Sequence, residues 1–135
     1  RDIPTAAAVL CRRALLAGAI LVAAFELLSR WLILIPFGDE FAGSIAPLRI
    51  LLPAVLAIGL ARALFSVFNA LQRPWPPAVL AAVGLTVMIE LDFAWIPERG
   101  IEGAALASLV AYFLVALGAA LWLAHTARPA AKPAA

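Results

Sequence analysis

The chain has 135 residues, of which 66% are hydrophobic and 13% are charged, and its mean hydropathy is +1.06. A soluble domain carries about twice that share of charge, so this composition excludes a soluble globular domain, whose surface needs charge to stay in water. The apolar residues come in runs of about 20, the length that crosses a bilayer core of roughly 30 Å. The composition therefore predicts an all-α integral membrane protein.

The small net charge of +2 does not indicate a nucleic-acid partner. The basic residues are scattered between apolar runs, a pattern that reports membrane topology rather than a binding patch. The chain has a single cysteine, Cys11, and a single histidine, His125. It therefore has no internal disulfide, and we expect neither a metal site nor a cofactor.

Four transmembrane helices are expected in chain order. Ser44 is a candidate cap for the second helix and Pro47 lies in its first turn. The stretch QRPWPP (residues 72–77) predicts a turn before the third helix. The four predicted spans are residues 14–35, 48–71, 78–96 and 103–124.

Charges between the spans predict an orientation. The ends of the chain and the middle loop carry basic residues, and the other two loops are mainly acidic. By the positive-inside rule, both termini and the middle loop face the cytoplasm. We expect residues 1–124 to form one transmembrane segment and residues 125–135 a disordered cytoplasmic tail. The basic residues are Arg12, Arg13, Arg73, Arg128 and Lys132, and the acidic loops hold Asp39, Glu40, Glu98 and Glu102 against Arg99.

Several ionisable side chains fall inside the predicted spans, where each costs at least ~2.5 kcal/mol to insert. Arg62 lies near the middle of the second span, and Ser66 and Asn69 follow it at i+4 and i+7 on the same face. We expect this polar stripe to line a cavity. Glu26, near the middle of the first span, is either a cavity residue or an i,i+4 structural partner of Arg30.

Three more charged residues belong to this group of candidates. Arg30 and Arg49 lie near span ends, so they are candidates for the cavity but can also extend to the membrane interface. Glu90 lies in the last turns of the third span, two residues before Asp92 and on a different face. Asp92 is close enough to the span end that we expect it at the interface.

Small residues predict where the helices pack closely. Glycine and alanine at a spacing of four let two helix backbones approach each other in lipid. Pro53, inside the second span, predicts a bend. Tryptophans near the span ends indicate an interfacial belt. The predicted packing residues are Gly59, Ala63, Gly103, Ala107 and Ala111, and the belt residues are Trp31, Trp75, Trp95 and Trp122.

The stretch IPERGIEGAALASLVAY (residues 96–112) resembles the end of the polysaccharide flippases of the Wzx type, in the MATE-like MOP exporter superfamily. In that family a helix ends at Ile-Pro, a turn with Gly-Ile-x-Gly-Ala-Ala follows, and the last core helix continues with small residues. FGDEFAGSIAPLRILLP (37–53) and ALFSVFNALQRPWPPAVLAAVG (63–84) resemble the preceding loops and helices. The resemblance covers most of residues 25–120. The chain departs from the family at Glu90 and Asp92, where asparagines are frequent.

The resemblance implies part of the C-terminal lobe of a two-lobe transporter in the bacterial inner membrane. The implied substrate is an undecaprenyl-diphosphate-linked oligosaccharide, moved from the inner to the outer leaflet by alternating access. Its partners would be membrane lipid and the remaining N-terminal helices of the same transporter. Arg62, with Arg49 and Arg30, would offer positive charge to the diphosphate, and Glu26 or Glu90 would balance that charge or couple a cation. No bond is made or broken, so no enzyme is expected.

The first residue, Arg1, is not a methionine, which favours a processed or truncated product. Two other functions stay open. A self-contained four-helix transporter would act as a dimer, like the small multidrug-resistance proteins, with Glu26 as its coupling acid. The cations Arg62 and Arg30 make such an interior unfavourable for a cationic drug. A membrane assembly subunit without transport would bury Glu26 and Arg62 against a second protein.

Overall fold

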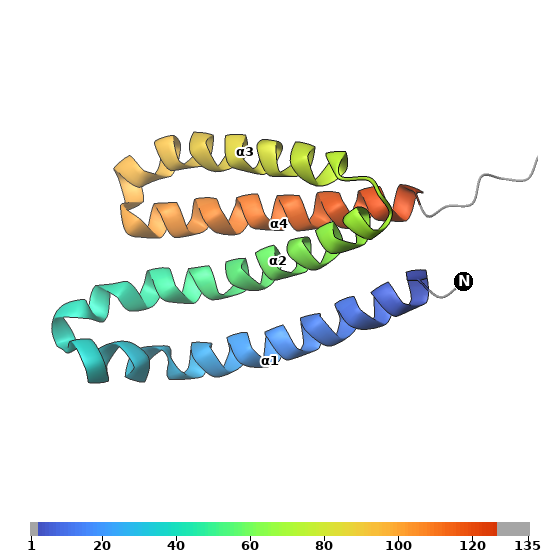
Figure 1. The fold of residues 1–135 in the computed structure, drawn as a ribbon. Coiled ribbons are helices and arrows are strands. Elements are labelled where there is room, and N and C mark those ends of the chain that lie inside the picture. Colours follow the sequence, from blue (N-terminus) through green and yellow to red (C-terminus); the bar gives the residue numbers. More distant parts are fainter. Residues whose placement is uncertain (1–2, 127–135) are drawn as a thin grey trace, which may run out of the picture.

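Four long helices make up the computed structural model, which describes residues 3–126. Each helix is long and apolar enough to cross a membrane, and no strand occurs within residues 3–126. The predicted all-α chain with four spans is confirmed in this form, which points to a multi-pass membrane protein. The elements are α1 (Ile3–Phe37), the 3₁₀ helix η1 (Asp39–Ser44), α2 (Ile45–Ala70), α3 (Trp75–Arg99) and α4 (Ile101–Thr126) (Figure 1).

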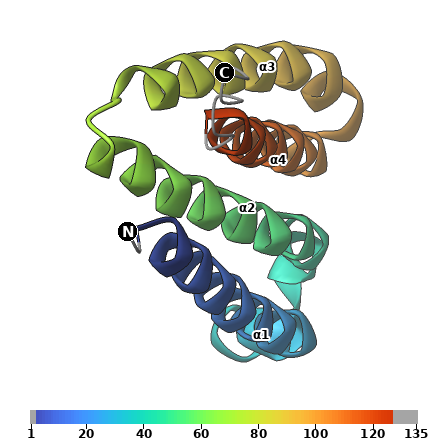
Figure 2. The ribbon, with the colours of Figure 1, turned by 90° about the vertical axis from the view of Figure 1, so that its right-hand side faces the viewer.

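The helices form one curved row in the order α1–α2–α4–α3, seen end-on in Figure 2. α4 lies between α2 and α3, whereas α1 contacts only α2 and η1. The helices are antiparallel, so their turns lie at the two ends of the helix axes. The turn that contains η1 and the α3–α4 turn lie at one end, and the α2–α3 turn lies at the opposite end (Figure 1). We call the first the acidic end, because Asp39, Glu40, Glu98 and Glu102 are there, and the second the terminal end.

All four helices begin earlier than the predicted spans, and α1 shows the largest difference. α1 starts at Ile3 rather than near residue 14, because Pro4 stands in the first turn, where no intrahelical N–H donor is required. α3 starts at Trp75, with Pro76 and Pro77 in its first turn. The expectation that all of residues 72–77 is non-helical is therefore wrong for residues 75–77.

The α2–α3 turn closes with a Schellman pair of hydrogen bonds. The Arg73 N–H donates to the Phe68 carbonyl at 3.0 Å, and the Gln72 N–H donates to the Asn69 carbonyl at 3.0 Å. Gln72 has a φ of 58°, a left-handed conformation that glycine usually takes. Pro74 follows and prevents α2 from continuing.

The remaining boundaries also differ from the prediction. Ser44 occupies the N-cap position of α2 but makes no side-chain capping hydrogen bond, because η1 runs directly into the helix. α3 continues through Pro97, and only Gly100, with a φ of 58°, separates it from α4. α4 runs to Thr126, so the first two residues of the predicted tail are helical. Residues 127–135 lie outside the described part.

Close packing is concentrated between α2, α3 and α4. One buried cluster joins small and aromatic side chains near the terminal end, and its largest member, Phe68, is fully buried. Many large apolar side chains on the outer faces are exposed, which suits contact with lipid tails. The cluster consists of Ala61, Leu64, Phe68, Leu80, Val115, Ala116 and Ala119.

The five predicted packing residues lie in different surroundings. In α4, Gly103, Ala107 and Ala111 are buried. A Cβ on Gly103 would lie 2.5 Å from the Trp95 carbonyl oxygen, so only glycine permits this approach of α3. In α2, Ala63 is half-buried, and Gly59 lies instead on an exposed face, where an added Cβ would meet nothing within 4 Å.

Candidate functional site

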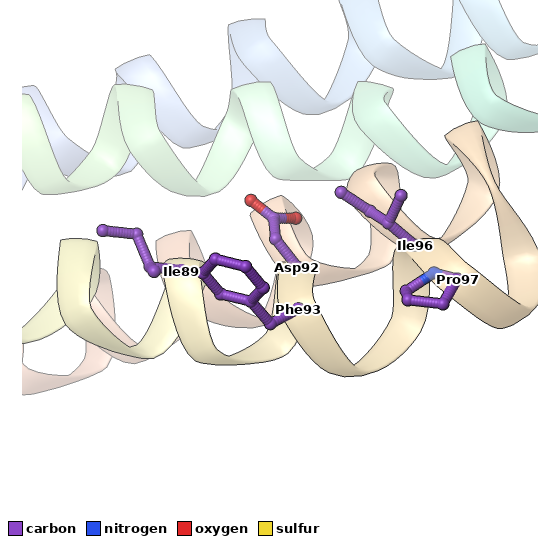
Figure 3. Close-up of a pocket in the computed structure, with 5 residues that line it drawn as sticks. All are labelled: Ile89, Asp92, Phe93, Ile96 and Pro97. Carbon is purple, nitrogen blue, oxygen red and sulfur yellow. The ribbon is translucent and has the colours of Figure 1, made fainter.

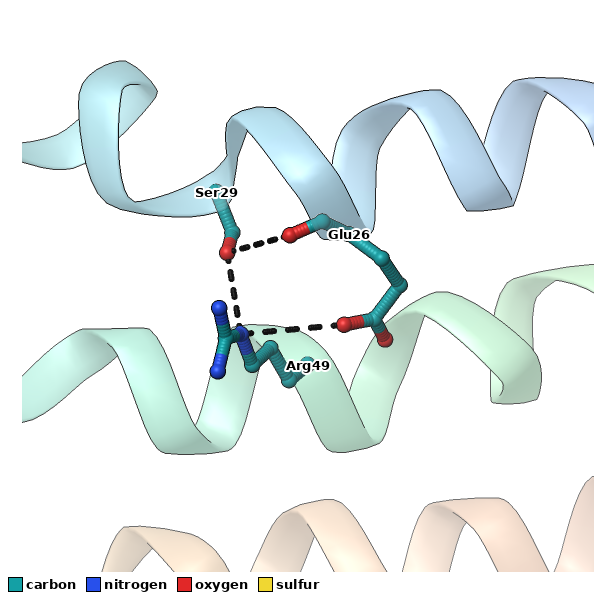
Figure 4. A network of polar contacts seen from close by, with 3 residues as sticks. All are labelled: Glu26, Ser29 and Arg49. Carbon is teal, nitrogen blue, oxygen red and sulfur yellow. Dashed lines mark hydrogen bonds and ion pairs between the residues drawn. The ribbon is translucent and has the colours of Figure 1, made fainter.

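A polar cluster joins α1 to α2 (Figure 4). Ser29, which is fully buried, donates from Oγ to the Glu26 carbonyl at 2.8 Å. Arg49 donates from Nε to the Ser29 Oγ at 3.0 Å, and the same Nε lies 3.7 Å from Glu26 Oε2. Because Glu26 and Ser29 are three residues apart, they share the face of α1 that meets α2.

Of the two contacts to Arg49, the hydrogen bond to Ser29 is the better defined. The ion pair with Glu26 is longer, and the two side chains are 53% (Arg49) and 34% (Glu26) exposed. An exposed ion pair of this kind holds its side chains only weakly. The buried hydroxyl of Ser29 therefore fixes the position of Nε, and Glu26 supplies the balancing charge.

The pairing differs from the one expected along α1. The sequence offered Arg30 as the i,i+4 partner of Glu26, but within residues 3–126 Glu26 forms its ion pair with Arg49 instead, and Arg30 is exposed. No periodic signal marks this partnership, because it joins residues 23 positions apart across the turn made by η1.

The Arg62 stripe lies on an open face of α2. Arg62, Ser66 and Asn69 are all exposed, as is Gly59 on the same face. The Ser66 hydroxyl donates to the Ala63 carbonyl of its own helix at 2.7 Å. Within the described residues, Arg62 forms no ion pair. The four helices thus leave the guanidinium of Arg62 uncovered inside α2 and the side-chain amide of Asn69 uncovered in the last turn of that helix.

The predicted cavity residues do not form one cluster. Arg49 and Arg62 are 13 residues apart on the continuous helix α2, which separates them by about 20 Å along the axis and about 140° around it. Glu90 is exposed on α3, at the opposite edge of the row from Glu26 and Arg30 on α1. The structure therefore brings Glu26 and Arg49 together and keeps Arg62 and Glu90 apart from them.

Asp92 has surroundings that the sequence did not predict. Its Oδ1 is buried and has no hydrogen-bond partner within residues 3–126. It lies in a shallow pocket whose other walls are apolar side chains of the same helix, α3 (Figure 3). No group of three His, Cys, Asp or Glu residues in the described part could hold a metal ion. The other lining residues are Ile89, Phe93, Ile96 and Pro97.

No protein-family model matches the chain, and no curated protein and no solved structure matches it either.

Proposed function

We propose that this chain is the C-terminal four-helix segment of a flippase that moves an undecaprenyl-diphosphate-linked oligosaccharide from the inner to the outer leaflet. The motif order over residues 25–120 supports the family, and four candidate spans agree with it. The observation that carries the proposal is the exposed face of α2 with Arg62, Ser66 and Asn69. A charge at this depth requires an anionic partner or water.

The groups on this face match a lipid-linked sugar diphosphate. A guanidinium stays charged and forms paired hydrogen bonds with phosphate oxygens. The hydroxyl of Ser66 and the amide of Asn69 can hydrogen-bond sugar hydroxyls. Gly59 leaves open space beside them. The lipid tail stays in the bilayer and no bond is broken, so the proposed activity is transport and not catalysis.

The remaining lobe of the transporter would cover this face from the other side. The row α1–α2–α4–α3 is one layer thick, so the chain alone does not enclose a pathway. We assign that cover to N-terminal helices of the same transporter, in a bacterial inner membrane with both termini of this segment cytoplasmic. Arg30 and Glu90, both exposed, would then add charge near the edges of the layer.

The alternative of a small, dimeric multidrug transporter depends on a free acid at Glu26. That carboxylate has a partner within the chain, the Arg49 guanidinium at 3.7 Å, so it is not the isolated acid that this alternative requires. The same contact within the chain weighs against a membrane assembly subunit, because in that function Glu26 would be buried against a second protein.

The test is Arg62→Ala in a full-length transporter that carries this segment, with glycan export measured as surface display per transporter in the membrane. We expect export to fall about tenfold or more, because a hydrogen bond to a charged group contributes ~1.5–3 kcal/mol. Thr86→Ala is the matched control, since the Thr86 hydroxyl is exposed and bonds only to the Ala82 carbonyl. Normal export by Arg62→Ala at normal protein levels would remove Arg62, and the proposed substrate site, from the mechanism.

A further inference from the structure

Within the described residues, the Arg49 guanidinium forms a hydrogen bond only from its Nε. Its Nε is held by the Ser29 Oγ at 3.0 Å and lies 3.7 Å from Glu26 Oε2. The two terminal nitrogens, Nη1 and Nη2, make no hydrogen bond within residues 3–126, and the side chain is 53% exposed. Figure 4 shows these two nitrogens on the side of the guanidinium away from the Glu26 carboxylate.

The contacts from α1 orient this open side of Arg49. A free arginine side chain has ~2 kcal/mol of rotamer entropy to lose when it binds a ligand. In this protein part of that entropy is already lost before a ligand binds, because Ser29 holds the Arg49 Nε. Ser29 is itself fully buried and hydrogen-bonded to the Glu26 carbonyl. Two adjacent N–H donors in a plane match two oxygens of a phosphate group.

Position indicates which phosphates can reach this site. Glu26 balances the charge of Arg49, and the adjoining η1 carries Asp39 and Glu40, so recognition here depends on the hydrogen-bond donors of the guanidinium rather than on a net positive charge. Arg49 is the fifth residue of α2, roughly 6 Å along the helix from its first residue. That depth is near the headgroup region of a membrane, where lipid phosphates lie.

We infer that Arg49, oriented by Ser29 and Glu26, is a binding site for the phosphate group of a membrane lipid at the acidic end of the protein. The site is separated from Arg62 by about 20 Å of helix and does not depend on the proposed transport function. Phosphate esters are common to phospholipids and phosphorylated polyprenols, and the guanidinium recognises the group they share.

The experiment measures the thermal unfolding midpoint of the chain in an uncharged maltoside detergent while phosphatidic acid is added. A ligand that binds the folded state raises this midpoint. We expect a saturable rise for the wild type and none with diacylglycerol, which has the same tails without the phosphate. Undecaprenyl phosphate and inorganic phosphate, added separately, distinguish a phospholipid source, a polyprenyl source and the free ion.

Arg49→Gln removes the positive charge and the planar pair of guanidinium donors, and we expect the apparent Kd for phosphatidic acid to rise at least tenfold. Arg49→Lys keeps the charge without the planar pair of donors, so it serves if Arg49→Gln does not fold, and we expect a several-fold rise. Ser29→Ala removes the oxygen that holds the Arg49 Nε, and we expect it to raise the apparent Kd by a smaller factor than Arg49→Gln does. Arg99→Gln is the matched control, because Arg99 is an exposed arginine at the same end of the protein, and it keeps wild-type binding.

Saturable binding of either lipid that Arg49→Gln weakens and Arg99→Gln does not supports the site. Equal binding by the wild type and both Arg49 variants overturns it, as does a response to inorganic phosphate with none to either lipid. Arg62→Gln separates the two proposals, because it removes the transport residue and leaves lipid binding at Arg49 unchanged.

Discussion

At the scale of single residues, Gly59 and Gly103 show how identical side chains take different roles. Both lie inside helices, and both have a small residue four positions later, Ala63 and Ala107. A Cβ on Gly103 would lie 2.5 Å from the Trp95 carbonyl oxygen and 2.7 Å from its carbon, whereas a Cβ on Gly59 meets nothing within 4 Å. Sequence spacing identified the pair, but only the neighbouring helix distinguishes them.

We expect Gly103→Ala to lower the free energy of unfolding by about 1–3 kcal/mol, since the methyl group meets backbone atoms that cannot move without separating α3 from α4. Gly59→Ala is the control and should leave stability unchanged or raise it by up to about 1 kcal/mol, because alanine favours a helix interior. Unfolding in detergent, followed by circular dichroism, measures both variants. Equal stability of the two would show that α3 and α4 approach less closely at this turn.

At the scale of elements, an aromatic contact ties the start of α3 to the end of α4. The rings of Trp75 and Trp122 meet edge to face, with centroids 4.8 Å apart and an interplanar angle of 79°. The sequence predicted both as interfacial anchors. It did not predict that they touch, since this depends on α3 and α4 being antiparallel neighbours of nearly equal length.

A double-mutant cycle tests this contact. We expect Trp75→Ala and Trp122→Ala to be non-additive by about 0.5–1.5 kcal/mol in unfolding free energy, the contribution of an aromatic pair beyond burial. Trp31 is 64% exposed on α1, and Trp31→Ala combined with Trp75→Ala should be additive. Additivity of the Trp75 and Trp122 changes would rule out an energetically significant contact.

At the scale of the whole molecule, the row of helices places all turns at two opposite ends. η1 and the α3–α4 turn lie at the acidic end, and the α2–α3 turn lies at the terminal end (Figure 1). The positive-inside rule assigns the acidic end to the outer face of the membrane. The structure shows which turns share an end, and the charges predict which side of the membrane that end faces.

Thiol labelling tests this orientation. In a chain with Cys11→Ser, we expect Gly43→Cys to react with a membrane-impermeant maleimide added to intact cells, because position 43 is exposed and has open space around it. Leu71→Cys, also exposed, should react only after the membrane is permeabilised. The reverse pattern would invert the proposed topology, and labelling of both positions from outside would contradict it.

The sequence by itself determined the class of the protein and the number of its spans, because length and hydropathy are local properties of each run. It also located the turn between α2 and α3, where Pro74 cannot continue a helix. It misplaced the start of α1, which continues through the charged pair Arg12 and Arg13 to Ile3, and the start of α3, where prolines in a first turn resemble a break.

Only the tertiary structure decided which charges meet. Arg49 pairs with Glu26 and Ser29 because η1 sets how α2 returns along α1, and no periodicity encodes that offset. The same holds for Gly103, whose role depends on the backbone of Trp95. Partners distant in sequence are chosen by the relative placement of whole helices, which the residues of any one helix do not specify.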